Sequence, residues 1–211
     1  TFEDLIAMNA LYRPGPMDSI PIYLRNRHEP DKISYKTPQL AHILDVTNGC
    51  IVYQEQVMQI FRELAGFSFG QADNVRRAMS KKKHAVMEAE REHFVHGCTE
   101  PGHECPGCVA NGIPEQVANQ IYDEMSSFAS YAFNKSHSAA YAMLSYRTAY
   151  LKANYPVEFM AALLSSELGN MDKISKFIEA CEGINIKVLG PDVNISRQMF
   201  TPIIDPDWSP S

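Results

Sequence analysis

Residues 131–156 read YAFNKSHSAAYAMLSYRTAYLKANYP, and this stretch guides the interpretation of the whole chain. It contains no Asp or Glu, although the chain has a formal net charge of -6. Apolar residues lie on all sides of one long predicted helix, 137–154, which indicates a buried helix. Ser136 is expected to cap this helix, and Pro156 to open the next one. The stretch therefore predicts a mainly α-helical fold.

The remaining sequence favours further helices and at most a few short strands. Thr1 and Asp4 are spaced like a capping box, and the prolines and glycine of residues 13–16 predict a turn. Helices are expected over 2–10, 17–27, 54–65, 70–79, 83–94, 114–127, 137–154, 156–166 and 171–182. An extended piece at 50–53, a loop at 96–113 and a strand at 186–189 complete the predicted fold.

The length and composition of the chain indicate a globular protein that is neither disordered nor membrane-spanning. With 211 residues, of which 45% are hydrophobic, the chain is long and apolar enough for a substantial core and is not disordered. Charges interrupt its apolar stretches and no signal peptide pattern opens it, so we expect no membrane partner. Its five Cys favour a reducing compartment, hence a cytoplasmic location. The first residue, Thr1, and the polar tail DPDWSPS predict a piece of a longer protein.

A first basic cluster follows the predicted helix 70–79. It reads RRAMSKKK and contains Arg76, Arg77, Lys81, Lys82 and Lys83. Arg77 and Lys81 stand four residues apart and therefore share a helix face. Arginine offers bidentate contacts to phosphate oxygens and lysine a mobile charge, so the cluster suits a polyphosphate. The alternative is a solvated basic face that pairs with the glutamates of the next helix.

A second polar cluster opens the long helix. It consists of Asn134, Lys135, Ser136 and His137. Free backbone N–H groups and the helix dipole favour an anion at such a position, and the Lys and His indicate phosphate. The alternative is a capped helix with polar residues in its first turn.

Three cysteines and a histidine lie in the predicted loop 96–113. Cys98, His103, Cys105 and Cys108 form a plausible tetrahedral set for a structural zinc ion. The alternative is three ordinary thiols in a loop. Paired carboxylates for a two-metal site are not recognisable in the sequence, so we expect ligand binding without the chemistry of phosphoryl transfer.

Five segments in order resemble the fingers domain of the bacterial DNA polymerase III alpha subunit, a C-family replicative polymerase. They are TFEDLIAMNALYRPGPM, GCIVYQEQVMQI, ADNVRRAMSKKK, YAFNKSHSAAYAMLSYRTAYLKANYPVEFMAALL and KVLGPDVN. The resemblance implies a helical fingers domain over 1–190, with 191–211 as a tail or the start of the following region. It also implies that the catalytic aspartates belong to a palm domain upstream, and that the clamp-binding region lies downstream.

The resemblance also assigns roles to the residues. Arg76 and Arg77 would face the triphosphate of the incoming deoxynucleoside triphosphate (dNTP), with the lysine run and the 134–137 cluster beside it. A supporting pocket would contain Arg13, Tyr53, Gln54, Gln56 and Tyr141. Any zinc would be structural and peculiar to relatives of this chain.

The implied function is positioning of dNTP and the template-primer end for DNA-directed DNA synthesis by the full-length nucleotidyltransferase. Mg²⁺ would be held by the palm, and the fragment alone would be inactive. The expected partners are dNTP, template-primer DNA, the rest of the polymerase chain and other replisome subunits. The alternative is a replisome interaction module without a nucleotide site, in which helix 83–94 and the cysteine loop dock a partner protein.

Overall fold

The computed structural model describes residues 1–81, 84–129, 131–194 and 196–203. The chain divides into two compact units, 1–142 and 143–211, and each is described by itself. The predicted mainly α fold is confirmed, because the described residues form helices and, in place of strands, two isolated bridges. A fingers boundary near residue 190 stays a prediction. No helix among the described residues is long and apolar enough to cross a membrane.

The first unit contains α1 to α8 and the start of α9. Its α-helices are α1 (Phe2–Leu11), α2 (Ile20–His28), α3 (Ala41–Leu44), α4 (Gln54–Ala65), α5 (Phe69–Ser80), α6 (His84–His96), α7 (Gly107–Ala110) and α8 (Glu115–Ala129). Short 3₁₀ helices are η1 (Pro16–Ser19), η2 (Pro30–Lys32), η3 (Pro38–Leu40) and η4 (Asp45–Thr47). Helix α9 (Lys135–Asn154) begins in this unit and continues into the second. Sequence reasoning missed α3, α7 and the 3₁₀ helices.

Local sequence signals explain where the main helices begin and end. The capping box of Thr1 and Asp4 is present at the start of α1, as predicted. Helix α4 covers the predicted range 54–65 and ends at Gly66, whose φ of 74° is left-handed and therefore favours glycine. Ser68 caps α5 by accepting a hydrogen bond from the Gln71 N–H at 3.3 Å. These boundaries place Arg76 and Arg77 on α5, directly after α4.

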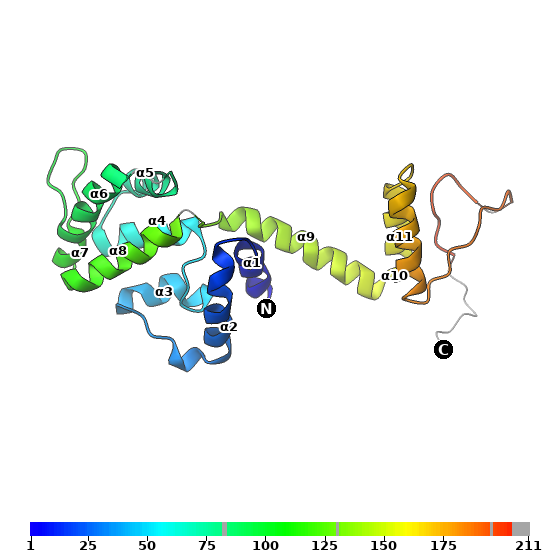
Figure 1. Cartoon of the computed structure of the whole chain (residues 1–211), viewed down its shortest axis with the longest axis horizontal. Helices are drawn as coiled ribbons and strands as arrows, with labels where there is room; N and C mark the ends of the chain where they lie inside the picture. Colours follow the sequence, from blue (N-terminus) through cyan, green and yellow to red (C-terminus); the bar gives the residue numbers. More distant parts are fainter. Residues whose placement is uncertain (82–83, 130, 195, 204–211) are drawn as a thin grey trace. The chain divides into compact units, whose positions relative to one another are not determined.

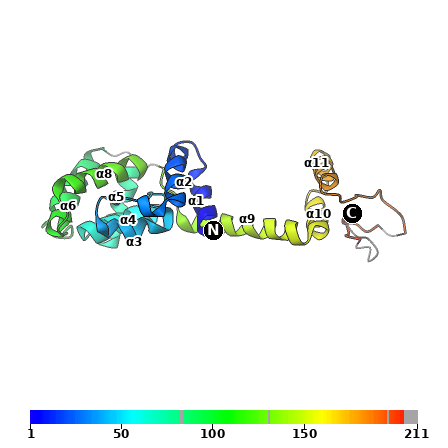
Figure 2. The same ribbon diagram turned by 90° about the horizontal axis from the view of Figure 1, so that it is seen from below.

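The larger core of the first unit is built around Phe61 of α4. Its ring lies 5.2 Å from Phe67, 5.0 Å from Phe94 and 6.0 Å from Tyr122, centroid to centroid. These partners come from the α4–α5 turn, α6 and α8, and Figures 1 and 2 show the helices gathered together. The predicted buried face of α4 is confirmed, since Val57, Phe61, Leu64 and Ala65 are all buried.

Replacing Phe61 with alanine is expected to lower the free energy of unfolding by about 3–5 kcal/mol, because the fully buried ring would leave a cavity among three aromatic neighbours. Urea unfolding followed by far-UV circular dichroism measures this change. Phe69→Ala is the matched control, since that ring is 65% exposed. Equal losses in both variants would contradict the assignment of Phe61 to the core.

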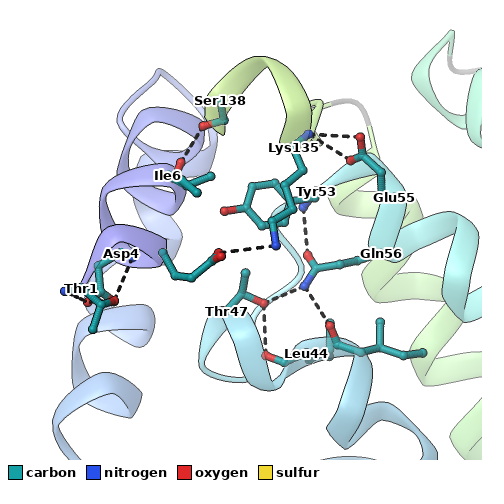
Figure 3. A network of polar contacts seen from close by, with 12 residues as sticks. Thr1, Asp4, Ile6, Leu44, Thr47, Tyr53, Glu55, Gln56, Lys135 and Ser138 are labelled. Atoms are coloured by element: carbon teal, nitrogen blue, oxygen red, sulfur yellow. Dashed lines mark hydrogen bonds and ion pairs between the residues drawn. The ribbon is translucent and has the colours of Figure 1, made fainter. Parts of the chain in front are cut away.

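A smaller core joins α1 and α2 to residues 50–53 and the first turns of α9. It includes Ile6, Leu11, Tyr23, Tyr53 and Ala142. The buried hydroxyl of Ser138 donates a hydrogen bond of 2.6 Å to the Ile6 carbonyl, so the start of α9 is fixed against α1 (Figure 3).

The second unit is built on α10 (Pro156–Ser166) and α11 (Met171–Glu182), which lie side by side in both views (Figures 1 and 2). Met160, Leu164, Ile174 and Cys181 form its core. The predicted strand at 186–189 is wrong. The Ile186 N–H bonds to the Cys181 carbonyl at 2.9 Å, so this segment turns back onto the end of α11 instead of pairing with a strand.

The prediction that the long helix is buried on all sides is also wrong. Among the described residues of α9, only Ser138 and Ala142 are buried, and Leu144 is 58% exposed. Apolar residues spread around a helix do not form a single stripe, so the pattern does not identify which neighbour covers them.

Candidate functional site

A parallel bridge between Tyr53 and Phe133 joins the start of α4 to the start of α9. The Gln54 N–H donates to the Phe133 carbonyl at 2.9 Å, and the Phe133 N–H donates to the Val52 carbonyl at 3.2 Å. The bridge brings the YQEQ element beside the Asn134–His137 cluster, although the two are far apart in sequence.

Asp73 lies between the two arginines of α5. Its Oδ1 accepts hydrogen bonds from Arg76 Nε at 3.0 Å and Nη2 at 2.7 Å, and its Oδ2 lies 2.8 Å from Arg77 Nε. Hydrogen bonds from Arg76 lower the pKa of Asp73, and Arg77 acts in the same direction, so the carboxylate is ionised at neutral pH. The two arginines differ in access, because Arg76 is 17% exposed and Arg77 65%.

Gln54 links Arg76 to the segment before α9. Its Oε1 accepts a hydrogen bond from Arg76 Nη1 at 2.9 Å, and its Nε2 donates to the Ala132 carbonyl at 3.0 Å. Arg76 is therefore held on three of its nitrogens. Arg77 pairs only with Asp73 among the described residues, which leaves most of its N–H groups available to a ligand.

A pocket of about 480 Å³ lies against this network. It is lined by Gln54, Glu55, Met58, Gln59, Arg62, Glu63, Phe69, Asp73, Arg76 and Asn134. The structure thus brings one member of each predicted cluster, Arg76 and Asn134, to the same pocket, together with the predicted Gln54.

The N-terminus of α9 already holds a carboxylate. Glu55 accepts hydrogen bonds from the Lys135 N–H, at 3.1 Å to each oxygen, and from Asn134 Nδ2 at 2.8 Å. Figure 3 shows Glu55 against the backbone nitrogen of Lys135. A phosphate at this position would therefore have to compete with Glu55 for the Lys135 N–H.

Asn134, not Ser136, caps α9. Its Oδ1 accepts a hydrogen bond from the His137 N–H at 2.8 Å, whereas Ser136 lies inside the first turn and is exposed. The predicted Ser136 cap is wrong, because the helix begins at Lys135, earlier than expected.

The Lys135 and His137 side chains contact other partners. Lys135 Nζ lies 3.4 Å from a carboxylate oxygen of Glu3 and 5.4 Å from the centre of the Tyr53 ring. The exposed His137 ring lies 5.4 Å from the Phe133 ring and 4.7 Å from Tyr141, centroid to centroid. Neither side chain lines the pocket beside Arg76.

Arg13 approaches the same segment from the YRPGP turn. Its Nη2 donates to the Tyr131 carbonyl at 2.8 Å, and its guanidinium carbon lies 4.4 Å from the centre of the Phe133 ring. The turn itself is tight: Gly15 has φ 101°, and a Cβ there would lie 2.7 Å from the Tyr131 ring. Arg13 therefore fixes residues 131–133 to the end of α1.

Gln56 and Tyr53, both predicted to support a pocket, are buried. Gln56 Oε1 accepts from the Val52 and Tyr53 N–H groups at 2.9 Å each, and its Nε2 donates to Ile43 O and Thr47 Oγ1 at 3.1 and 2.7 Å. Figure 3 shows the contacts of Gln56 with Tyr53 and Thr47. This uses the full hydrogen-bonding capacity of the amide. Tyr53 lies in the smaller core. Neither Gln56 nor Tyr53 lines the pocket beside Arg76, so their supporting role stays a prediction.

The lysine run is only partly described. Lys81 is exposed at the end of α5, one turn beyond Arg77. Lys82 and Lys83 lie outside the described residues.

The side chains of Cys98, His103, Cys105 and Cys108 are not grouped as the predicted zinc site requires. Cys98 and Cys105 exchange two backbone hydrogen bonds of 2.9 Å, while Cys105 and Cys108 are buried in the larger core and His103 is exposed. Burial raises the pKa of the Cys108 thiol to about 12, which disfavours the thiolate. Within the described ranges, no three Cys, His, Asp or Glu side chains are grouped to hold a metal ion, so the zinc prediction is not supported.

Sequence reasoning missed Asp73 and Glu55. Asp73 precedes Arg76 and Arg77 by three and four residues, so helical spacing alone signals its contact with both. Glu55 carries no such signal, since its partners at the start of α9 are distant in sequence.

Comparison with known proteins identifies the class of domain. Residues 1–102 match the family model described as bacterial DNA polymerase III alpha subunit finger domain.

Three relatives, each named DNA polymerase III subunit alpha, extend the match along the chain. The protein of Thermus aquaticus is 50% identical over 92% of this chain, and that of Chlamydia trachomatis serovar D is 49% identical over 94%. The Bacillus subtilis protein is 46% identical over 94% of the chain. The chain therefore belongs to the bacterial DNA polymerase III alpha subunit family, as the resemblance predicted. It spans 15–17% of the length of these relatives.

Proposed function

We propose that this chain is the fingers part of a DNA-directed DNA polymerase and that it positions the incoming dNTP and the template-primer end. The relatives are named as polymerase subunits, and the finger-domain match covers α1 to α6. A cytoplasmic location and contacts with the remaining polymerase chain and replisome subunits belong to the same proposal.

The observation that carries the proposal is the Arg76–Gln54 contact beside Asn134. Arg76 of α5 donates a hydrogen bond of 2.9 Å to Gln54 at the start of α4, and both residues line one pocket with Asn134, which caps α9. Arg77, exposed next to it, pairs only with Asp73 among the residues that the structure describes, so its other guanidinium N–H groups are available to bind phosphate oxygens. Contacts of this kind orient a triphosphate and stabilise the charge that develops on it.

The metal ions of the reaction are part of the same proposal. In the proposal, Mg²⁺ is held by the palm, and the fingers contribute cationic side chains only.

Hydrogen–deuterium exchange on the full-length polymerase tests this proposal. The enzyme is bound to template with a dideoxy-terminated primer, and exchange is compared with the complementary dNTP, a non-complementary dNTP, and no nucleotide. We expect the complementary dNTP alone to slow exchange in peptides covering 69–81 and 131–141. Protection elsewhere in the polymerase, with these peptides unchanged, would contradict the proposal.

The same experiment addresses the alternative of a protein-interaction module. One charged residue of α6, Arg91, already has partners within the first unit. Its Nη2 lies 2.6 Å from Asp123, and its guanidinium lies over the Tyr122 ring. Unchanged exchange with nucleotide, combined with protection of 84–113 by another replisome subunit, would favour the interaction module.

A further inference from the structure

Asp73 forms ion pairs with both arginines of α5, Arg76 and Arg77. It uses a separate oxygen for each, with Oδ1 on Arg76 and Oδ2 on Arg77. Its side chain is 22% exposed, between the two arginines in access, and it also lines the pocket. The Asp73 carboxylate therefore restrains the position of both guanidinium groups.

The Asp73 side chain is itself held in place by neighbouring residues. Arg76 holds Asp73 from one side and is held in turn by Gln54, whose Nε2 binds the Ala132 carbonyl at 3.0 Å. The chain of contacts runs from the segment before α9 through Gln54, Arg76 and Asp73 to Arg77. Arg77, the last residue of this series, has an exposed guanidinium group, whereas that of Arg76 is mostly buried.

We propose that Asp73 is a positioning residue that orients Arg77 toward the triphosphate of the incoming nucleotide, while Arg76 serves as its anchor. The inference rests on the proposed function of the fingers. Arg77 carries a long side chain whose rotamer entropy opposes a single orientation, and binding through a pre-oriented side chain avoids that cost. Asp73 restrains Arg77 at Nε, and within the described part of the chain neither terminal nitrogen of Arg77 has a partner, so both can face phosphate oxygens.

Two simpler roles for Asp73 make different predictions. If the carboxylate only offsets the charge of the arginines, Asp73→Asn adds net positive charge and lowers the KM for dNTP. If it only supports helix α5, Asp73→Asn lowers stability and leaves KM unchanged, because its pair with Arg76 is largely buried. The positioning role predicts a raised KM in addition to any loss of stability.

The test is a double-variant cycle in the full-length polymerase, measured by steady-state primer extension. We expect Asp73→Asn to raise the KM for dNTP by about tenfold, the scale of one charge-assisted hydrogen bond to phosphate. Asp73→Glu, which keeps the charge, should recover part of this loss. In an Arg77→Ala background, Asp73→Asn should change KM less than about twofold, because residues that act through one another are not additive.

Asp31→Asn serves as the control, since Asp31 is exposed in η2, away from the arginine pair. A lower or unchanged KM for Asp73→Asn would overturn the positioning role, as would a full additional loss in the Arg77→Ala background. The proposed function would still stand in those cases if Arg77→Ala alone raises KM. An Arg77→Ala enzyme with normal kinetics would overturn both the positioning role and the assignment of Arg77 to the nucleotide.

Discussion

Replacing Arg77 with alanine in the full-length polymerase is expected to raise the KM for dNTP by about ten- to hundredfold. Hydrogen bonds to charged groups contribute about 1.5–3 kcal/mol, and about 1.4 kcal/mol corresponds to a factor of ten in affinity. Arg77 is 65% exposed and is paired only with Asp73 in the described part of the chain, so it is available to phosphate oxygens. Steady-state primer extension at varied dNTP concentration measures the change.

Two further variants make this prediction specific. Arg25→Ala removes an exposed arginine from α2 and should leave KM unchanged. Arg77→Lys keeps the charge but loses the planar fork, so it should recover only part of the affinity. If Arg25→Ala raises KM as much as Arg77→Ala, the effect is one of net charge, and Arg77 has no particular contact with the nucleotide.

Helix α4 shows how much of the fold follows from local sequence. Its apolar positions recur at helical spacing, Gly66 supplies the left-handed residue that ends it, and the structure reproduces the predicted range and buried face. Such signals depend on residues within a few positions of one another. The 3₁₀ turns before it lack this periodicity, so the sequence did not reveal them.

The candidate site was predictable in its residue types but not in its geometry. The basic pattern indicates Arg76 and the family resemblance implies Gln54, and the structure places their interacting atoms 2.9 Å apart. The contact depends on the bridge between Tyr53 and Phe133, which is a tertiary feature. For the same reason, the Glu55 carboxylate at the start of α9 could not be anticipated.

The exposed part of α9 illustrates a different limit. An apolar composition predicts that a surface is covered, but it does not say by which part of a protein. The burial prediction rests on apolar residues around α9, and it is wrong for the described chain, in which Ser138 and Ala142 are the buried residues of this helix. The chain spans 15–17% of the length of the relatives compared.

Replacing Gln56 with leucine is expected to cause the largest loss of stability among single changes near the site. The amide satisfies two backbone N–H groups, one carbonyl and the Thr47 hydroxyl, and all four partners belong to buried residues. An unpaired buried polar group costs about 1–3 kcal/mol, so the free energy of unfolding should fall by about 4 kcal/mol or more. Urea or thermal unfolding of the chain, followed by far-UV circular dichroism, measures the loss.

Gln59→Leu is the matched control, because it makes the same change one turn further along α4. This position is partly exposed, and its amide bonds to Glu63 alone among the described residues. It should change stability by no more than about 0.5 kcal/mol. The loss in Gln56→Leu should also reach the site, since the amide fixes the Val52–Tyr53 backbone that bridges to Phe133 and so holds Gln54 against Arg76. A Gln56→Leu chain as stable as the control would mean that this backbone is held by the surrounding core alone.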